Sequence, residues 1–193
     1  MSWLGRIGFL LYITRSQGIA RRYFFVNGFD GALTMLGLLT GFYAGGGVAT
    51  ELAISACLGA ALALGASGIS SAYVSEAAER RKALRELEHA MIERLHESAH
   101  GEAARLVPVF IALVNGFAPF MISLLIMVPL WLDLHGVALP LNPVVAAIAF
   151  AFFAIFLLGV FLGRISHTYW LWSGIRAVLI AAATCALILL LRG

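Results

Sequence analysis

Five long apolar stretches divide this chain, and each is long enough to cross a bilayer as a helix, which takes roughly 20 residues. They cover residues 23–43, 52–75, 106–132, 143–163 and 169–191. Hydrophobic residues make up 62% of the chain and charged residues only 12%, a balance that soluble domains do not show. We therefore expect an all-α integral membrane protein with five transmembrane helices, surrounded by the lipid bilayer.

The basic residues predict how these helices are oriented. If there are five spans, twelve of the thirteen lysines and arginines fall on one side of the membrane, and only Arg192 falls on the other. Because basic loops favour the cytoplasmic side, we expect the N-terminus and residues 76–105 to be cytoplasmic and the C-terminus to be outside. A positive charge distributed in this way argues against nucleic acid as a partner.

A short repeat suggests how the spans are organised. Val-Asn-Gly-Phe occurs at residues 26–29 and again at 114–117, near the start of the first and third spans. Both of these spans run outward from the cytoplasm, so the repeat predicts two parallel hairpins followed by a fifth helix. The chain then divides into an N-terminal cytoplasmic or interfacial segment, a first hairpin, a cytoplasmic Glu/His-rich helical segment and three further spans, at 1–22, 23–75, 76–105 and 106–193.

One acidic residue, Asp30, lies inside the first span. A charge at that depth costs several kcal/mol unless it is paired, hydrated or neutralised, and such residues typically line an ion path. At 100° per residue, Asn27, Asp30 and Thr34 share an arc of about 80° with two glycines, Gly37 and Gly41. Such an oxygen lining suits a hard or borderline divalent cation. The alternative is a protonated carboxylic acid that bonds to a neighbouring helix and stabilises packing.

Two more residues are candidates for the same path. Met35 lies close to Asp30 in the sequence and offers a soft thioether ligand; the alternative is that its side chain faces lipid. Asn115 is the repeat partner of Asn27. It either lines the path as well or forms a hydrogen bond between helices.

The segment 76–105 is expected to form one amphipathic cytoplasmic helix between the second and third spans. Its candidate metal ligands are Glu76, Glu79, Glu86, His89, Glu93, His96 and Glu97. In a helix, four of these glutamates share an arc of about 40°, and the Glu-x-x-His spacing places a carboxylate and an imidazole on adjacent turns, as in di-iron helical proteins. The alternative is a solvated helix with pairs such as Glu76–Arg80 and Lys82–Glu86. A single helix cannot close a metal site, so its ligands would have to meet across a dimer.

The sequence resembles the vacuolar iron transporter family, and its prokaryotic branch in particular. The resemblance is carried by Asn-Gly-Phe-Asp-Gly-Ala-Leu-Thr at residues 27–34, by Gly-Ile-Ser-Ser-Ala-Tyr-Val-Ser-Glu at 68–76, and by the glutamate-rich segment before the third span. Two features differ from the family pattern. Ser71 stands where the family usually has a methionine, and the cytoplasmic segment is shorter.

The resemblance implies a homodimer in a prokaryotic plasma membrane, with the first spans lining a central path. It implies export of Fe²⁺ or Mn²⁺ in exchange for protons, with Asp30 binding the metal and the cytoplasmic glutamates gathering it. The alternative is a non-transporting membrane protein whose cytoplasmic helix is a dimerisation or docking element. Because the sequence contains no catalytic constellation, we expect neither an enzyme nor a prosthetic group, and the metal is a transported substrate.

Overall fold

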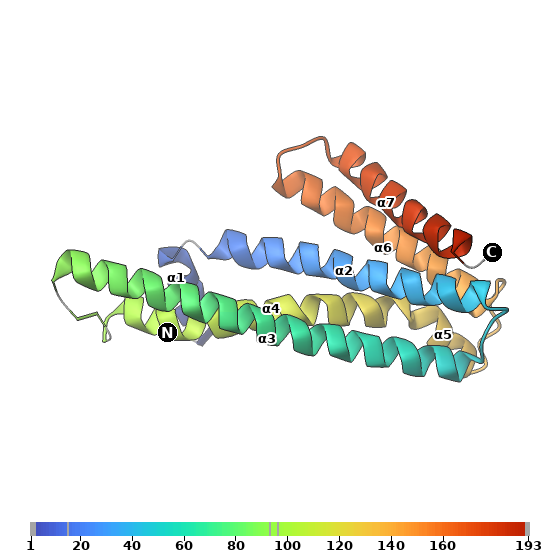
Figure 1. Ribbon diagram of the computed structural model, residues 1–193, viewed down its shortest axis with the longest axis horizontal. Coiled ribbons are helices and arrows are strands. Elements are labelled where there is room, and N and C mark those ends of the chain that lie inside the picture. Colours follow the sequence, from blue (N-terminus) through green and yellow to red (C-terminus); the bar gives the residue numbers. More distant parts are fainter. Residues whose placement is uncertain (1–2, 15, 93, 96, 192–193) are drawn as a thin grey trace.

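The computed structural model describes residues 3–14, 16–92, 94–95 and 97–191, and within these ranges the chain is helical with no strand. The described residues form seven helices (Figure 1): α1 (Trp3–Ile13), α2 (Gln17–Ala44), α3 (Thr50–Met91), α4 (Ala99–Ile126), α5 (Val128–Leu134), α6 (Pro143–Ile165) and α7 (Trp170–Leu190). The prediction of an all-α chain is therefore confirmed.

Four of these helices, α3, α4, α6 and α7, are long and apolar enough to cross a membrane. The chain is therefore compatible with a multi-pass membrane protein. The expected first span lies in α2, which does not meet the same hydropathy criterion, so the count of five spans is not confirmed. Asn27, Asp30 and several glycines and threonines lower the mean hydropathy of α2.

Helix α2 lies at the centre of the bundle. It packs against α3 and α4 on one side and against α6 and α7 on the other. Figure 1 shows α2, α3 and α4 along the long axis of the molecule, with α6 and α7 crossing obliquely above α2. The main core forms around α2, where Met35, Leu36 and Leu39 are fully buried together with Ile126 of α4 and Ile155 of α6.

Glycines allow the helices at the centre to approach closely. A Cβ added at Gly31 of α2 would come within 2.7 Å of the Pro119 Cα of α4. A Cβ added at Gly116 of α4 would collide with the carbonyl oxygen of Gly65 and lie 2.9 Å from the backbone nitrogen of Ile69, both on α3. Only residues without a side chain fit at these two contacts, as is common where membrane helices touch.

One end of the molecule extends well past the bundle. Helix α3 has 42 residues, so at 1.5 Å per residue it is about 63 Å long, roughly twice the thickness of the hydrocarbon core. Its distal half lies beside the start of α4 and beside α1, on the left of Figure 1. We call this region, made by α1, residues 76–91 of α3 and residues 99–107 of α4, the polar head.

Helix α1 packs its apolar face against the N-terminal half of α4. Leu10 and Leu11 are buried against Val107 and Ile111 of α4. At its surface, Arg6 donates to Glu102 over 2.6 Å, and this hydrogen bond to a carboxylate raises the pKa of Arg6 above its ordinary value. Arg6 therefore stays charged over the whole physiological range.

The expected single helix over residues 76–105 is wrong. Helix α3 continues without a break from the apolar stretch to Met91, and Ile92 then adopts a left-handed conformation with φ 54°. Helix α4 begins at Ala99, where the Ser98 side chain accepts a hydrogen bond from the Gly101 backbone nitrogen. The segment is thus two halves of a helical hairpin, rather than a separate helix between two spans.

The close contact of α3 and α4 predicts that Gly116→Ala destabilises the protein by about 1–3 kcal/mol, the usual cost of overpacking a core. The new methyl group would meet backbone atoms of α3, which cannot move aside without separating the helices. Gly59→Ala is the matched control, because Gly59 is also helical and has open space around its Cβ position. Thermal unfolding in detergent measures both variants. Equal unfolding temperatures would contradict the predicted contact.

Candidate functional site

The two repeated asparagines meet in the middle of the bundle. The Asn27 side-chain nitrogen donates to the Tyr23 carbonyl oxygen over 3.0 Å and to the side-chain oxygen of Asn115. The Asn115 nitrogen in turn donates to the Gly68 carbonyl oxygen over 2.8 Å. These bonds connect α2, α4 and α3 and satisfy polar groups that would be costly to leave unpaired in a membrane. They bear out the interpretation of Asn115 as an interhelical hydrogen bonder.

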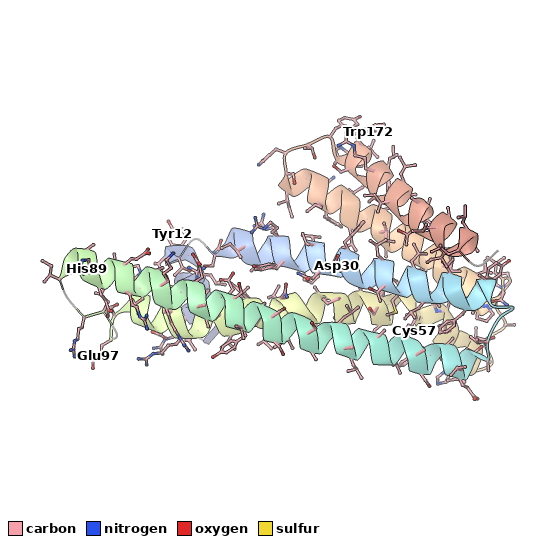
Figure 2. All side chains as sticks on the ribbon, viewed as in Figure 1. Tyr12, Asp30, Cys57, His89, Glu97 and Trp172 are labelled. Atoms are coloured by element: carbon pink, nitrogen blue, oxygen red, sulfur yellow. The ribbon has the colours of Figure 1, made fainter. Side chains whose placement is uncertain are left out.

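Asp30 lies one turn further along α2, on a face that the described part of the chain leaves open. Asp30 is exposed, and so is Val26 one turn before it. Figure 2 shows Asp30 near the middle of the bundle's length. Among the described residues, no side chain forms a hydrogen bond or an ion pair with its carboxylate. The expected alternative, in which Asp30 bonds to a neighbouring helix, therefore finds no support within this part of a single chain.

The other residues of the expected arc around Asp30 do not all face the same way. Thr34 follows Asp30 on the open face, half-buried, and its hydroxyl donates to the Asp30 backbone carbonyl oxygen over 2.8 Å. Gly41 continues the same face with open space at its Cβ position, whereas Gly37 lies against Ile188 of α7. Asn27 instead turns toward α4. The open face of α2 is thus Val26, Asp30, Thr34 and Gly41, and we use that name below.

Met35 does not belong to the open face. Its side chain is fully buried in the main core, beside Leu36 and Leu39. The interpretation of Met35 as a lipid-facing side chain is therefore wrong, and its thioether is held among apolar neighbours. The residue directly after Thr34 is turned by about 100° around the helix, which in this bundle is enough to place it in the core.

Two acidic residues of the polar head form the expected pairs with basic neighbours. Glu76 is almost fully buried and lies 3.7 Å from Arg80, one turn further along α3. Arg80 also donates to the hydroxyl oxygen of Ser16 over 2.6 Å, which connects α3 to the start of α2. Lys82 and Glu86 form a second pair at 4.0 Å in an exposed position. Both pairs were predicted by the solvated-helix alternative.

Among the described residues, the expected metal ligands do not come together within one chain. Glu79 is exposed on α3, His89 lies in the last turn of that helix, and Glu97 lies in the turn that follows it. Figure 2 shows His89 and Glu97 at the far end of the polar head. Glu93 and His96 are outside the described residues. In the described ranges, no group of three or more His, Cys, Asp or Glu side chains could hold a metal ion.

The helix break also changes the geometry of the proposed ligand pairs. Glu86 and His89 remain on adjacent turns of α3. Glu97 and His100 do not form a helical pair, because Glu97 precedes α4 and His100 lies in its first turn. The expected arc that joined Glu79 to Glu97 on one helix is therefore wrong.

Sequence reasoning missed two residues at the centre of the bundle, Gly65 and Gly68. Both line the contact of α3 with α4, and the Gly68 carbonyl accepts the bond from Asn115. The abundance of glycine and alanine in this stretch indicated close packing in general. It did not indicate which partner the glycines would face.

Comparison with known proteins identifies no relative. No protein-family model, curated protein or solved structure matches this chain. The resemblance to vacuolar iron transporters therefore rests on the residues of this sequence.

The connected asparagines predict a measurable coupling. Asn27→Ala and Asn115→Ala should each destabilise the protein, by about 1–3 kcal/mol where a buried partner is left unpaired. The double variant should lose less than the sum, because the bond that both share is removed only once. A coupling energy of about 0.6 kcal/mol, and up to about 1.7, is typical of side-chain bonds between membrane helices.

Thermal or denaturant unfolding in mixed micelles measures the four variants of this cycle. The control cycle pairs Asn27→Ala with Ser70→Ala, because the Ser70 hydroxyl bonds only to the Ala66 carbonyl oxygen of its own helix. That pair should be additive. If the destabilisations by Asn27→Ala and Asn115→Ala were additive as well, this would contradict the hydrogen bond between the two side chains.

Proposed function

We propose that this chain is one subunit of a homodimeric transporter that exports Fe²⁺ or Mn²⁺ from the cytoplasm in exchange for protons. The observation that carries the proposal is the Asp30 carboxylate, which lies mid-length in the bundle on the open face of α2. Hydrocarbon against that carboxylate would cost several kcal/mol. A second copy of α2 would cover it and would bring two carboxylates together.

A pair of Asp30 residues would make a ligand set that one chain lacks. The two carboxylates, with the two Thr34 hydroxyls one turn away, would supply oxygen ligands of the kind that divalent cations bind. Met35 is buried in the core and would not take part. The preference for Fe²⁺ or Mn²⁺ comes from the family resemblance, because oxygen ligands alone do not select these ions over other divalent cations.

Proton exchange follows from the chemistry of the same carboxylates. A metal ion binds the deprotonated acid, and a proton on Asp30 removes the ligand and releases the ion, so that metal affinity depends on pH. Asn27 and Asn115 would hold α2 against α4 at one edge of this path. No other chemistry, and no prosthetic group, is needed for the exchange.

Five spans and a parallel pseudo-repeat are part of the proposal. Equivalent positions of the two repeat units touch each other within one chain: Asn27 contacts Asn115, and Gly31 contacts Pro119, each pair 88 residues apart. Helix α3 packs on α4, and α6 packs on α2, so the second helix of each hairpin lies against the first helix of the other. This reciprocal packing supports a two-fold symmetry relation between the hairpins, with α2 as a fifth span.

The orientation is proposed from charge. The N-terminus and the polar head would be cytoplasmic and the C-terminus outside, in a prokaryotic plasma membrane. Arg164 and Arg176 lie over the rings of Trp170 and Trp172, at 5.5 and 5.6 Å from the ring centroids. Tryptophan–arginine contacts of this kind are typical of helix ends at a membrane interface, and they support the end of α6 and the start of α7 as cytoplasmic boundaries.

The polar head would gather metal before it enters the path. Glu79, Glu86 and His89 are exposed on α3, where the same residues of a second copy could meet them, although Glu86 also pairs with Lys82. Because the described part of one chain holds no three-ligand group, we propose that a site there takes ligands from both subunits. Glu76 is the exception, since it is buried against Arg80 and serves the packing of the head.

A second function is favoured by the ion pairs of the polar head. The pairs Glu76–Arg80 and Lys82–Glu86 use two of the proposed ligands for helix stabilisation. In this alternative the protein does not transport, and the polar head is a dimerisation or partner-docking element. Purified full-length protein in proteoliposomes separates the two functions, because only a transporter gives a proton flux that depends on added Fe²⁺ or Mn²⁺.

Asp30→Asn is predicted to abolish metal-for-proton exchange in proteoliposomes while the dimer stays intact. The amide keeps the shape of the side chain but neither carries the charge nor takes up the proton. Glu51→Gln is the matched control, because Glu51 is an exposed acid in the first turn of α3, and its variant should transport at the wild-type rate. Unchanged exchange in Asp30→Asn would overturn the mechanism.

The proposed dimer also predicts a specific cross-link. In a chain with Cys57→Ala and Cys185→Ala, Val26→Cys should form a disulfide between two copies in native membranes, because Val26 precedes Asp30 on the open face of α2. Phe153→Cys is the control, on an exposed position of α6. Non-reducing electrophoresis reads out both variants. Equal cross-linking of the two, or none at residue 26, would contradict this interface.

A further inference from the structure

The outer groove between α3 and α4 begins with an apolar trough of about 560 Å³. Its walls carry Leu62, Ala66 and Ile69 from α3, and Leu113, Phe117 and Phe120 from α4. These residues belong to helices that are long and apolar enough to span the membrane. The trough therefore lies at a depth where hydrocarbon chains surround the protein.

The same groove continues into a basic pocket of about 530 Å³. Three arginines line it: Arg81 and Arg85 from α3, and Arg105 from the second turn of α4. All three are exposed, and no described residue forms an ion pair with them. Their neighbours differ, since Arg80, Lys82 and Arg6 each pair with a glutamate.

One acidic residue also lines the basic pocket. Glu88 accepts a hydrogen bond from the Leu95 backbone nitrogen over 2.8 Å and so contributes to the turn between the helices. Three guanidinium groups against one carboxylate leave the basic pocket with a net positive charge. Arginine presents a planar fork of donors that matches two oxygens of a phosphate group.

The trough and the basic pocket follow each other along one groove. Ile69 of the trough and Tyr73 of the basic pocket are four residues apart on α3, and Leu113 of the trough and Pro108 of the basic pocket are five residues apart on α4. From Leu62 to Arg81 the groove follows 19 residues of helix, or about 28 Å at 1.5 Å per residue. One leaflet takes up about half of the roughly 30 Å hydrocarbon core, so the groove is long enough to hold a single lipid from its headgroup to the end of its chain.

We propose that this groove is a binding site for one anionic phospholipid, with the phosphate-bearing headgroup at Arg81, Arg85 and Arg105 and an acyl chain in the trough. Charge complementarity selects an anionic headgroup, because a zwitterionic lipid brings its own cation to the phosphate. Basic pockets at the ends of membrane helices bind anionic headgroups in this way. A free phosphate would leave the trough unused, so the apolar half of the groove assigns the ligand to a lipid.

The site is separate from the open face of α2. It lies between α3 and α4 and includes none of the residues proposed to carry metal. Lipid binding here therefore stands or falls independently of metal transport.

The purified full-length protein in detergent tests this site by thermal unfolding with added lipid. Dioleoyl phosphatidylglycerol is expected to raise the unfolding temperature, and dioleoyl phosphatidylcholine, with the same chains, is not. The variant Arg81→Gln/Arg85→Gln/Arg105→Gln should bind phosphatidylglycerol on the order of a hundredfold more weakly, from the usual contribution of each basic side chain near anionic lipid. The control Arg22→Gln/Lys82→Gln/Arg94→Gln removes the same charge outside the groove and should keep wild-type affinity.

A second variant tests the apolar half with the arginines intact. Ala66→Phe fills the trough from an exposed position of α3, and it should weaken phosphatidylglycerol binding while the protein keeps its unfolding temperature without lipid. Native mass spectrometry of retained lipid gives an independent readout if a variant is unstable on heating.

Three outcomes would overturn the proposal. Equal weakening by the groove variant and its control would mean general attraction of anionic lipid to a basic surface. An equal effect of phosphatidylcholine would mean that the headgroup is not recognised. The same stabilisation by inorganic phosphate, at matched concentration, would mean a free anion rather than a lipid.

Discussion

The contact between α2 and α4 determines how the rest of the chain is arranged. Gly31 against Pro119 brings the two backbones together, and the bond between Asn27 and Asn115 fixes their register one turn away. Side-chain packing alone discriminates poorly between registers when every neighbour is apolar. Two amide side chains that hydrogen-bond to each other select one register, because any other register leaves two unpaired polar groups in the membrane.

That register has a consequence for both sides of α2. Its core face is used by Met35 and Leu39, and its flank by Asn27. What remains is the open face with Asp30 and Thr34, which no other helix of the described chain covers. The packing of α2 against its neighbours therefore leaves a carboxylate and a hydroxyl on the one side of the helix that the described chain does not use.

Much of the fold was predictable because it depends on local composition. The apolar stretches correspond to helices, except that residues 106–132 are divided between α4 and α5 at Met127. The two copies of Val-Asn-Gly-Phe are in contact, and two ion pairs of the polar head follow i,i+4 spacing. The errors concern tertiary context. The end of α3 depends on a turn held by Glu88 bonding to Leu95 and by the Ser98 cap, which periodicity does not reveal. The burial of Met35 depends on which helices surround α2. The surroundings of Asp30 depend on how α2 packs against the other helices, which the pattern within α2 does not show.

Because α3 is one uninterrupted helix, its two ends move together as a rigid rod. From Ile69 to Met91 it contains neither glycine nor proline, the residues at which helices most often bend. From Gly68, at the glycine contact, to Met91 this helix is about 35 Å long at 1.5 Å per residue, so a rotation of about 5° at that contact moves its far tip by roughly 3 Å. A molecule that binds at the outer end of α3 and displaces it would therefore also change the packing of α3 against α4 at the glycine contact in the middle of the bundle.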